Sequence, residues 1–171
     1  AATKLVQGAS TPYETHTHLA QLKPWTVHQG KLKKTDADVT VFTLDTKSAH
    51  PNDTALARNA LKKLRTTKHP YLLNCVDAGE LPEQHIIYML TEPVTPLASY
   101  IDELRETPSN IVWGLYTLTA AVNCLSVDCK FVHGQVCVQS IFVDKGMDWK
   151  ARRTSHSLCS RALVVKVRLA R

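Results

Sequence analysis

The sequence has 171 residues, enough for one compact domain or a large piece of one, and 44% of them are hydrophobic, which excludes a disordered chain. No apolar run approaches the roughly 20 residues that cross a bilayer, and residues 1–8 lack the apolar stretch of a secretory signal, so we expect no transmembrane segment. Five cysteines without a regular framework favour a reducing, cytoplasmic compartment.

The net charge of +6 is concentrated in the segment 150–171. This segment holds seven basic residues and no acidic one, which leaves 14 basic against 15 acidic residues in the rest of the chain. A basic tail can bind nucleic acid or anionic lipid. On charge pattern alone, a solvated or aberrant C-terminus is the interpretation we favour.

In the first half of the chain, polar residues and two prolines predict weak structure over residues 1–23. Segments rich in β-branched and aromatic residues predict four strands, at 25–28, 39–44, 71–76 and 85–90. A helix is expected over 55–67, with Asn52, Asp53 and Thr54 as candidate N-caps.

In the second half, Pro93 and Pro96 break the chain into a connector. Helices are predicted over 97–106 and 110–128, and short strands at 131–132 and 141–143. The longer helix carries an apolar stripe formed by Ile111, Leu115, Leu118, Val122 and Leu125. Trp25 and Trp113 are expected to anchor the core.

The order of these elements indicates the fold class. Strands that follow one another without crossover helices are unusual for a doubly wound parallel sheet. We therefore expect an α+β fold, with a small antiparallel sheet and one helix joined by a hinge to a helical part.

This layout resembles the protein-kinase fold. The segment 61–70 looks like the end of the kinase C-helix and its His-Pro turn, 90–94 looks like the hinge, and 131–144 looks like the catalytic loop and the following strand. More narrowly, four stretches resemble the N-terminal kinase-like, or Scy-like, pseudokinase family; they are 25–30, 39–42, 91–97 and 132–143. The Glu-Pro-Val-Thr-Pro-Leu run at 92–97 is the most specific of them.

The resemblance covers residues 24–150 and implies three regions. We expect a weakly structured segment at 1–23, a partial kinase-like domain with a truncated helical C-lobe at 24–150, and a divergent basic tail at 151–171. The tail looks like a truncated, alternatively spliced or misread C-terminus. Without the central C-lobe helix, the apolar stripe would be partly exposed, so we expect aggregation or dependence on a partner.

The nucleotide-binding parts implied by the resemblance are degenerate. Residues 16–29 contain no glycine, so the loop that covers phosphates is missing. Phe42 stands where a kinase has the third-strand Lys, and Ala60 stands where the helix carries its Glu partner. Their joint loss is physically coherent, because losing one partner alone would leave a buried charge unpaired.

The catalytic loop is degenerate as well. It reads His133-Gly134-Gln135 in place of His-Arg-Asp, with Cys137 at the Lys position and Ser140 at the metal-binding Asn position. The Asp-Phe-Gly sequence that binds Mg²⁺ should fall near 153–155, in a basic stretch without acidic residues. We therefore predict a catalytically inactive pseudokinase.

We assign no catalytic residue, no cofactor and no metal ligand. Four positions are hinge-like without implying a bound nucleotide: Thr91, Glu92, Pro93 and Val94. Cys129, His133 and Cys137 could form part of a zinc site, but a Cys-x-x-Cys pair and a fourth ligand are missing. A cysteine nucleophile at Cys137 lacks an orienting acid nearby.

The resemblance implies a scaffold or adaptor that binds protein partners, in coatomer-dependent traffic between Golgi and ER and in tRNA export. The implied location is cytoplasmic and peripheral to Golgi membranes. Two alternatives stay open, an ATP-binding kinase with residual activity and a nucleic-acid-binding protein that uses its basic tail.

Overall fold

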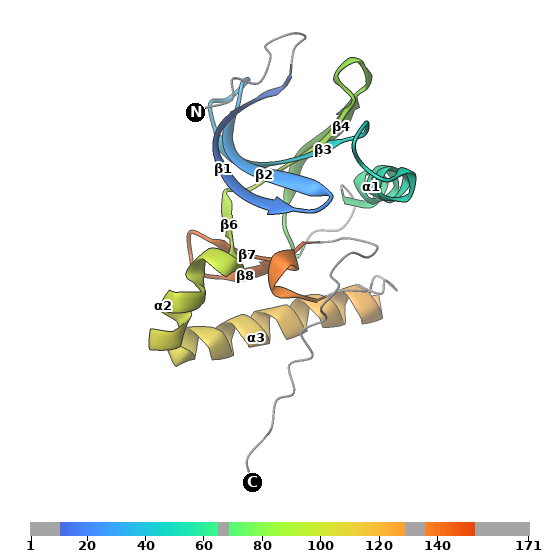
Figure 1. Cartoon of the computed structure of the whole chain (residues 1–171). Coiled ribbons are helices and arrows are strands. Elements are labelled where there is room, and N and C mark those ends of the chain that lie inside the picture. The colour runs from blue at the N-terminus through green and yellow to red at the C-terminus, as the bar shows by residue number, and fades with distance from the viewer. Residues whose placement is uncertain (1–10, 65–68, 129–135, 153–171) are drawn as a thin grey trace.

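The computed structural model describes residues 11–64, 69–128 and 136–152. These residues form an upper part, a sheet with one helix, above a lower part that contains a second, smaller sheet and two helices (Figure 1). The upper sheet has five strands in the order β1-β2-β3-β5-β4, and all neighbouring strands are antiparallel. They span Tyr13–Leu22 (β1), Trp25–Leu32 (β2), Asp38–Asp45 (β3), Cys75–Leu81 (β4) and Ile86–Thr91 (β5).

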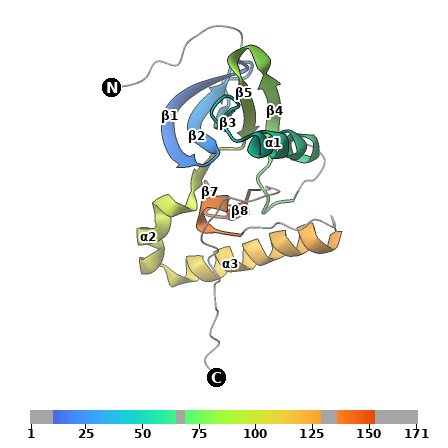
Figure 2. The same ribbon diagram turned by 45° about the vertical axis from the view of Figure 1, so that its right-hand side comes forward.

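Helix α1, Pro51–Leu64, covers one face of the upper sheet (Figure 2). Side chains that alternate along each strand form separate hydrophobic clusters on the two faces. The face toward α1 carries Trp25, Val27, Phe42, Leu44, Ile87 and Met89, together with Ala57 of the helix. The opposite face carries Tyr13, Val39, Val41, Tyr88 and Leu90. Burial on both faces fixes the register of the central strands.

The lower part begins with β6, Val94–Pro96, which pairs with β7, Ile141–Asp144. Strand β8, Trp149–Ala151, completes this three-stranded antiparallel sheet. Short 3₁₀ turns occur at Pro82–Gln84, Leu97–Tyr100 and Val138–Ser140. The helices are α2, Ile101–Glu106, and α3, Pro108–Asn123, which continues into a π-helical turn at Cys124–Asp128.

Helix α3 packs beneath the small sheet (Figures 1 and 2). Its buried residues Leu118 and Ala121 join a cluster that includes Ile141, Val143 and Trp149. A Cβ added at Gly114 would overlap the Trp149 indole, so glycine at this position allows the close approach of helix and strand. Trp149 is 6% exposed and anchors the lower core.

The sequence predicted the antiparallel sheet and its single helix, and both are confirmed. The expectation of weak structure over 1–23 is wrong for β1, which occupies Tyr13–Leu22. Helix α1 starts before its three candidate caps, because His50 supplies the cap: its Nδ1 accepts a hydrogen bond from Asn52 N at 3.2 Å.

Some later elements also differ from expectation. The strand predicted at 71–76 lies instead at Cys75–Leu81, and residues 71–73 pair with β8 through a single bridge and two hydrogen bonds. The short strands β6 and β8 were not predicted. The predicted strand at 131–132 lies outside the described residues.

The most exposed apolar face of α3 was not predicted, while the predicted stripe is partly exposed at three of its five residues. The stripe from Ile111 to Leu125 lies against the lower core, where Leu118 and Leu125 are buried and the rest are half-buried. Exposure falls on the opposite flank, where Val112 is 69%, Trp113 47% and Tyr116 60% exposed. Trp113 is therefore not a core anchor; its Nε1 donates a hydrogen bond to Asp148 Oδ1 at 2.7 Å.

The segment Pro108–Val127 spans 20 residues and contains an 18-residue stretch with a mean hydropathy of 1.3. By length and composition this helix is long and apolar enough to cross a membrane, as are the core helices of some soluble proteins. The expectation of no transmembrane segment stays a prediction. Packing of the inner face of this helix against the small sheet accounts for its apolar composition.

Gly114→Ala tests the packing of α3 on β8. The added methyl group overlaps the Trp149 indole, so we expect the free energy of unfolding to fall by about 1–3 kcal/mol. Helix propensity alone predicts the opposite sign, a gain of about 1 kcal/mol. Urea denaturation measures the difference, with the exposed Thr119→Ala on the same helix as control. A stabilised Gly114→Ala variant would show that α3 and β8 are not in this contact.

Candidate functional site

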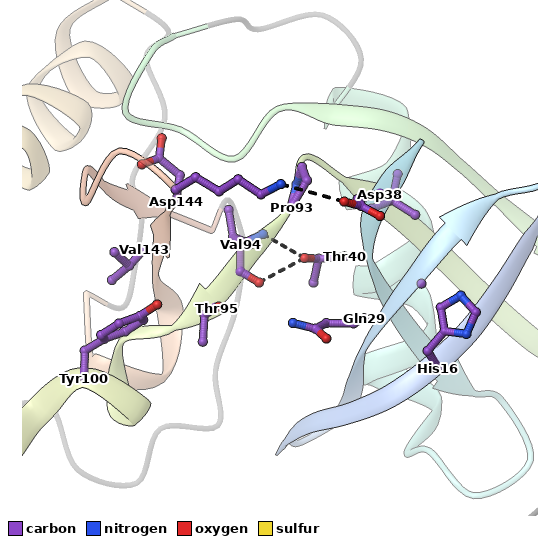
Figure 3. A pocket seen from close by; sticks show the side chains of 13 residues that line it. His16, Gln29, Asp38, Thr40, Pro93, Val94, Thr95, Tyr100, Val143 and Asp144 are labelled. Carbon is purple, nitrogen blue, oxygen red and sulfur yellow. Dashed lines mark hydrogen bonds and ion pairs between the residues drawn. The ribbon is translucent and has the colours of Figure 1, made fainter. Parts of the chain in front are cut away.

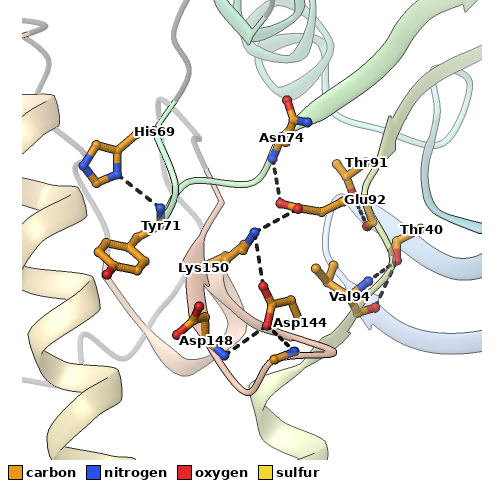
Figure 4. Close-up of polar contacts among 11 residues, drawn as sticks. Thr40, His69, Tyr71, Asn74, Thr91, Glu92, Val94, Asp144, Asp148 and Lys150 are labelled. Carbon is orange, nitrogen blue, oxygen red and sulfur yellow. Dashed lines mark hydrogen bonds and ion pairs between the residues drawn. The ribbon is translucent and has the colours of Figure 1, made fainter.

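The candidate site lies where the upper and lower parts meet, around a connector formed by residues 91–94. Thr40 of β3 reaches across to this connector and is 1% exposed. Its hydroxyl donates to Val94 O at 3.0 Å and accepts from Val94 N at 2.9 Å (Figure 4). Both backbone groups that Val94 could offer to a ligand are therefore already bonded within the protein.

Phe42 lies on the same strand, at the position predicted to replace the kinase Lys. Its ring meets Phe142 of β7 edge to face, with centroids 5.3 Å apart and planes at 74°. Both side chains have 0% exposure and belong to one cluster with Val27 and Val94. Apolar side chains thus fill the junction between the upper sheet and β7. A ligand could enter this particular space only by displacing them.

On α1, the structure brings Ala57 into the cluster that contains Phe42, while Ala60, the predicted Glu position, is half-buried. Neither side chain carries a carboxylate. The tight turn between β1 and β2 is Lys23-Pro24, and proline has no backbone N–H to donate to a phosphate.

The positions expected to hold Mg²⁺ in a kinase are occupied by internal contacts. Ser140 Oγ donates to Cys137 O at 2.8 Å and accepts from Cys137 N at 3.1 Å, and both residues are buried. Arg152 N donates to Ser140 O at 2.8 Å. His133, Gln135 and the segment 153–155 lie outside the described residues, as do Cys129 and the zinc alternative built on it.

Arg152 places a cation beside this expected metal position. Burial lowers its pKa to about 10, while Cys137 acts in the opposite direction. At that value the guanidinium stays protonated at neutral pH, so a divalent cation at the same place would be repelled. The absence of an acidic side chain here was predicted, but the burial of Arg152 was not.

A charged cluster behind the connector was missed by sequence reasoning. Lys150 Nζ lies 2.8 Å from Glu92 Oε2 and 3.2 Å from Asp144 Oδ2 (Figure 4). Burial is the largest influence and lowers the pKa of Lys150, but its bonds to Glu92 and Asp144 together outweigh it and raise the pKa overall. Because Glu92 and Lys150 are 58 residues apart, no local pattern could have paired them.

Further hydrogen bonds connect the segment 71–74 to β8 and to the connector. Leu73 N donates to Ala151 O at 3.1 Å, and Ala151 N donates to Tyr71 O at 3.0 Å. Asn74 N donates to Glu92 Oε1 at 3.1 Å, which connects this segment to the charged cluster. The junction is thus held by aromatic packing, backbone pairing and a partly buried ion cluster.

A cavity of about 250 Å³ opens on the outer side of the connector (Figure 3). Its polar lining residues are His16, Gln29, Asp38, Thr40, Thr95, Tyr100, Asp144 and Lys145. Among the described residues that line it, Lys145 is the one lysine or arginine, and it pairs with Asp38 at 3.7 Å. A triphosphate, with several negative charges, would find little compensation here.

No protein-family model matches the chain. Over 126 residues, 74% of the chain, the sequence is 35% identical to the probable inactive serine/threonine-protein kinase scy1 of Dictyostelium discoideum. It is 25% identical over 144 residues, 83% of the chain, to the protein kinase domain-containing protein ppk3 of Schizosaccharomyces pombe. A Mus musculus relative, the protein-associating with the carboxyl-terminal domain of ezrin, is 32% identical over 91 residues, 53% of the chain.

The chain spans 15%, 22% and 12% of these three relatives. The upper sheet with its helix is compatible with the N-lobe of a protein kinase, and the similarity to a probable inactive kinase agrees with the degenerate positions. The described fold and site therefore define a kinase-like domain of the inactive class, a pseudokinase. The chain belongs to the N-terminal kinase-like, Scy1-like family. The hinge and C-lobe correspondences remain predictions.

Thr40→Val tests the bond between β3 and the connector. The isosteric change removes both hydrogen bonds and leaves two buried backbone groups of Val94 unsatisfied, so we expect a loss of about 1–3 kcal/mol in the free energy of unfolding. Thr43→Val is the matched control, because its half-buried hydroxyl makes only a 3.5 Å contact to Thr26 O. Equal losses in the two variants, measured by urea denaturation, would contradict the assignment.

Proposed function

We propose that the chain is a non-catalytic kinase-like scaffold that acts by binding other macromolecules through its surface. The observation that carries the proposal is the filled junction, in which Phe42 and Phe142 occupy the space between the upper sheet and β7. Phosphoryl transfer needs an open cleft with a phosphate-binding cation and metal ligands. In the described residues this region holds the rings of Phe42 and Phe142, the buried Arg152, and Ser140, whose hydroxyl is hydrogen-bonded to Cys137 O.

The proposal extends to biological context through family resemblance. We propose a cytoplasmic protein at the periphery of Golgi membranes, with coatomer or other traffic machinery as partners and tRNA as a further candidate. Membership of the Scy1-like family supports this context. The name of the mouse relative, which refers to association with the carboxyl-terminal domain of ezrin, supports protein binding as the general mode.

Because the chain spans a small share of its relatives, much of their partner binding is expected to need additional sequence. Within the described part, the flank of α3 formed by Val112, Trp113 and Tyr116 brings together three exposed large apolar side chains. The rings of Trp113 and Tyr116 stack with centroids 5.4 Å apart. Exposed aromatic pairs of this kind are common in binding surfaces.

A thermal melt with and without Mg-ATP tests the proposal. A functional site filled to about 100 times its dissociation constant would add about 2.7 kcal/mol and raise the melting temperature by several degrees. We expect no shift, because Phe42 and Phe142 fill the space beside β3 and the cavity at the connector offers little positive charge to a triphosphate. Samples with ATP and EDTA separate binding of the nucleotide from binding of Mg²⁺. A clear Mg-dependent shift would overturn the proposal and favour the ATP-binding alternative.

A further inference from the structure

Two histidines face each other across the hairpin of β1 and β2. His18 and His28 are direct cross-strand partners in the antiparallel register. Their rings lie with centroids 5.2 Å apart and planes at 79°. The register of β1 shifts on both sides of His18, between Thr15 and His18 and between His18 and Ala20. Such irregularities re-aim side chains, and here the result is a close imidazole pair.

One ring nitrogen of this pair, Nδ1 of His28, has no hydrogen bond among the described residues. This atom is buried. Such a nitrogen needs a partner to offset its loss of water. His18, by contrast, is exposed.

The spacing of the rings suits a shared metal ion. Two imidazoles on one tetrahedral zinc, with Zn–N bonds of about 2.0–2.1 Å, have ring centroids about 5 Å apart. The observed separation of 5.2 Å agrees with this value. Neutral imidazole is the form that binds metal.

We propose that His18 and His28 form an open, two-histidine site for a divalent transition metal such as Zn²⁺. Among the described residues, no group of three or more His, Cys, Asp or Glu side chains could hold a metal. The remaining coordination positions are open to water or to a further side chain. A bound metal ties the edge strand β1 to β2 and stabilises the hairpin.

Zinc titration by isothermal calorimetry, on metal-free protein in a buffer that does not bind zinc, tests the site. We expect His18→Ala to weaken the binding component at least tenfold, because one imidazole alone cannot chelate. His28→Gln should have the same effect, with a thermal melt to establish that this half-buried substitution leaves the protein folded. Zinc should raise the melting temperature of the parent protein and not that of His18→Ala.

His16→Ala is the matched control, since His16 lies on the same strand and is also exposed. We expect it to bind zinc as the parent protein does. A loss of binding equal to that of His18→Ala would assign the site to the pair His16 and His18 and overturn the proposal. Unchanged zinc affinity in His18→Ala would overturn it as well, by showing that other side chains bind the metal.

Discussion

Phe42 of β3 and Phe142 of β7 meet edge to face at the junction of the upper and lower parts, and neither ring is exposed to solvent. Aromatic pairs in this geometry add about 0.5–1.5 kcal/mol beyond the burial of their surface. The contact extends one hydrophobic cluster from the five-stranded sheet into the three-stranded sheet. A space that holds polar groups in an active kinase is core in this protein.

The polar contacts around the rings are consistent with this role. Thr40 satisfies both backbone groups of Val94 at the edge of the cluster, and Lys150 ties Glu92 to Asp144 behind it. A buried charge without its partner is strongly destabilising, so the loss of the Lys at Phe42 is compatible with alanines on the facing helix. At the expected metal position, Ser140 is bonded within its own turn and Arg152 supplies a positive charge.

Sequence reasoning found the parts of the fold that have a strong local pattern. Segments rich in β-branched and aromatic residues predicted β2, β3 and β5, and apolar residues at helical spacing predicted α1 and α3. It missed β1 because this edge strand has one buried residue, Tyr13, so polar side chains dominate its pattern. It missed β8 because a three-residue strand has no readable period.

Some features of the candidate site could likewise be predicted from the sequence, and others could not. The sequence alone identified the residues at the positions of the kinase motifs, such as Phe42 and Ser140. Their roles remain predictions. The partners that define the site were not readable, because contacts such as Phe42 with Phe142 and Glu92 with Lys150 join distant segments. Trp113 and Trp149 show the same limit: composition identifies two large aromatics, but only packing decides which one is buried.

A double-mutant cycle on Phe42→Leu and Phe142→Leu measures the central contact most directly. Leucine keeps both positions apolar, so the variants test the ring contact with little change in hydrophobicity. The free energies of unfolding of the parent, the single variants and the double variant give the coupling energy. We predict a coupling of about 0.5–1.5 kcal/mol. Additive single effects, within about 0.3–0.5 kcal/mol, would contradict the account that the two rings close the junction together.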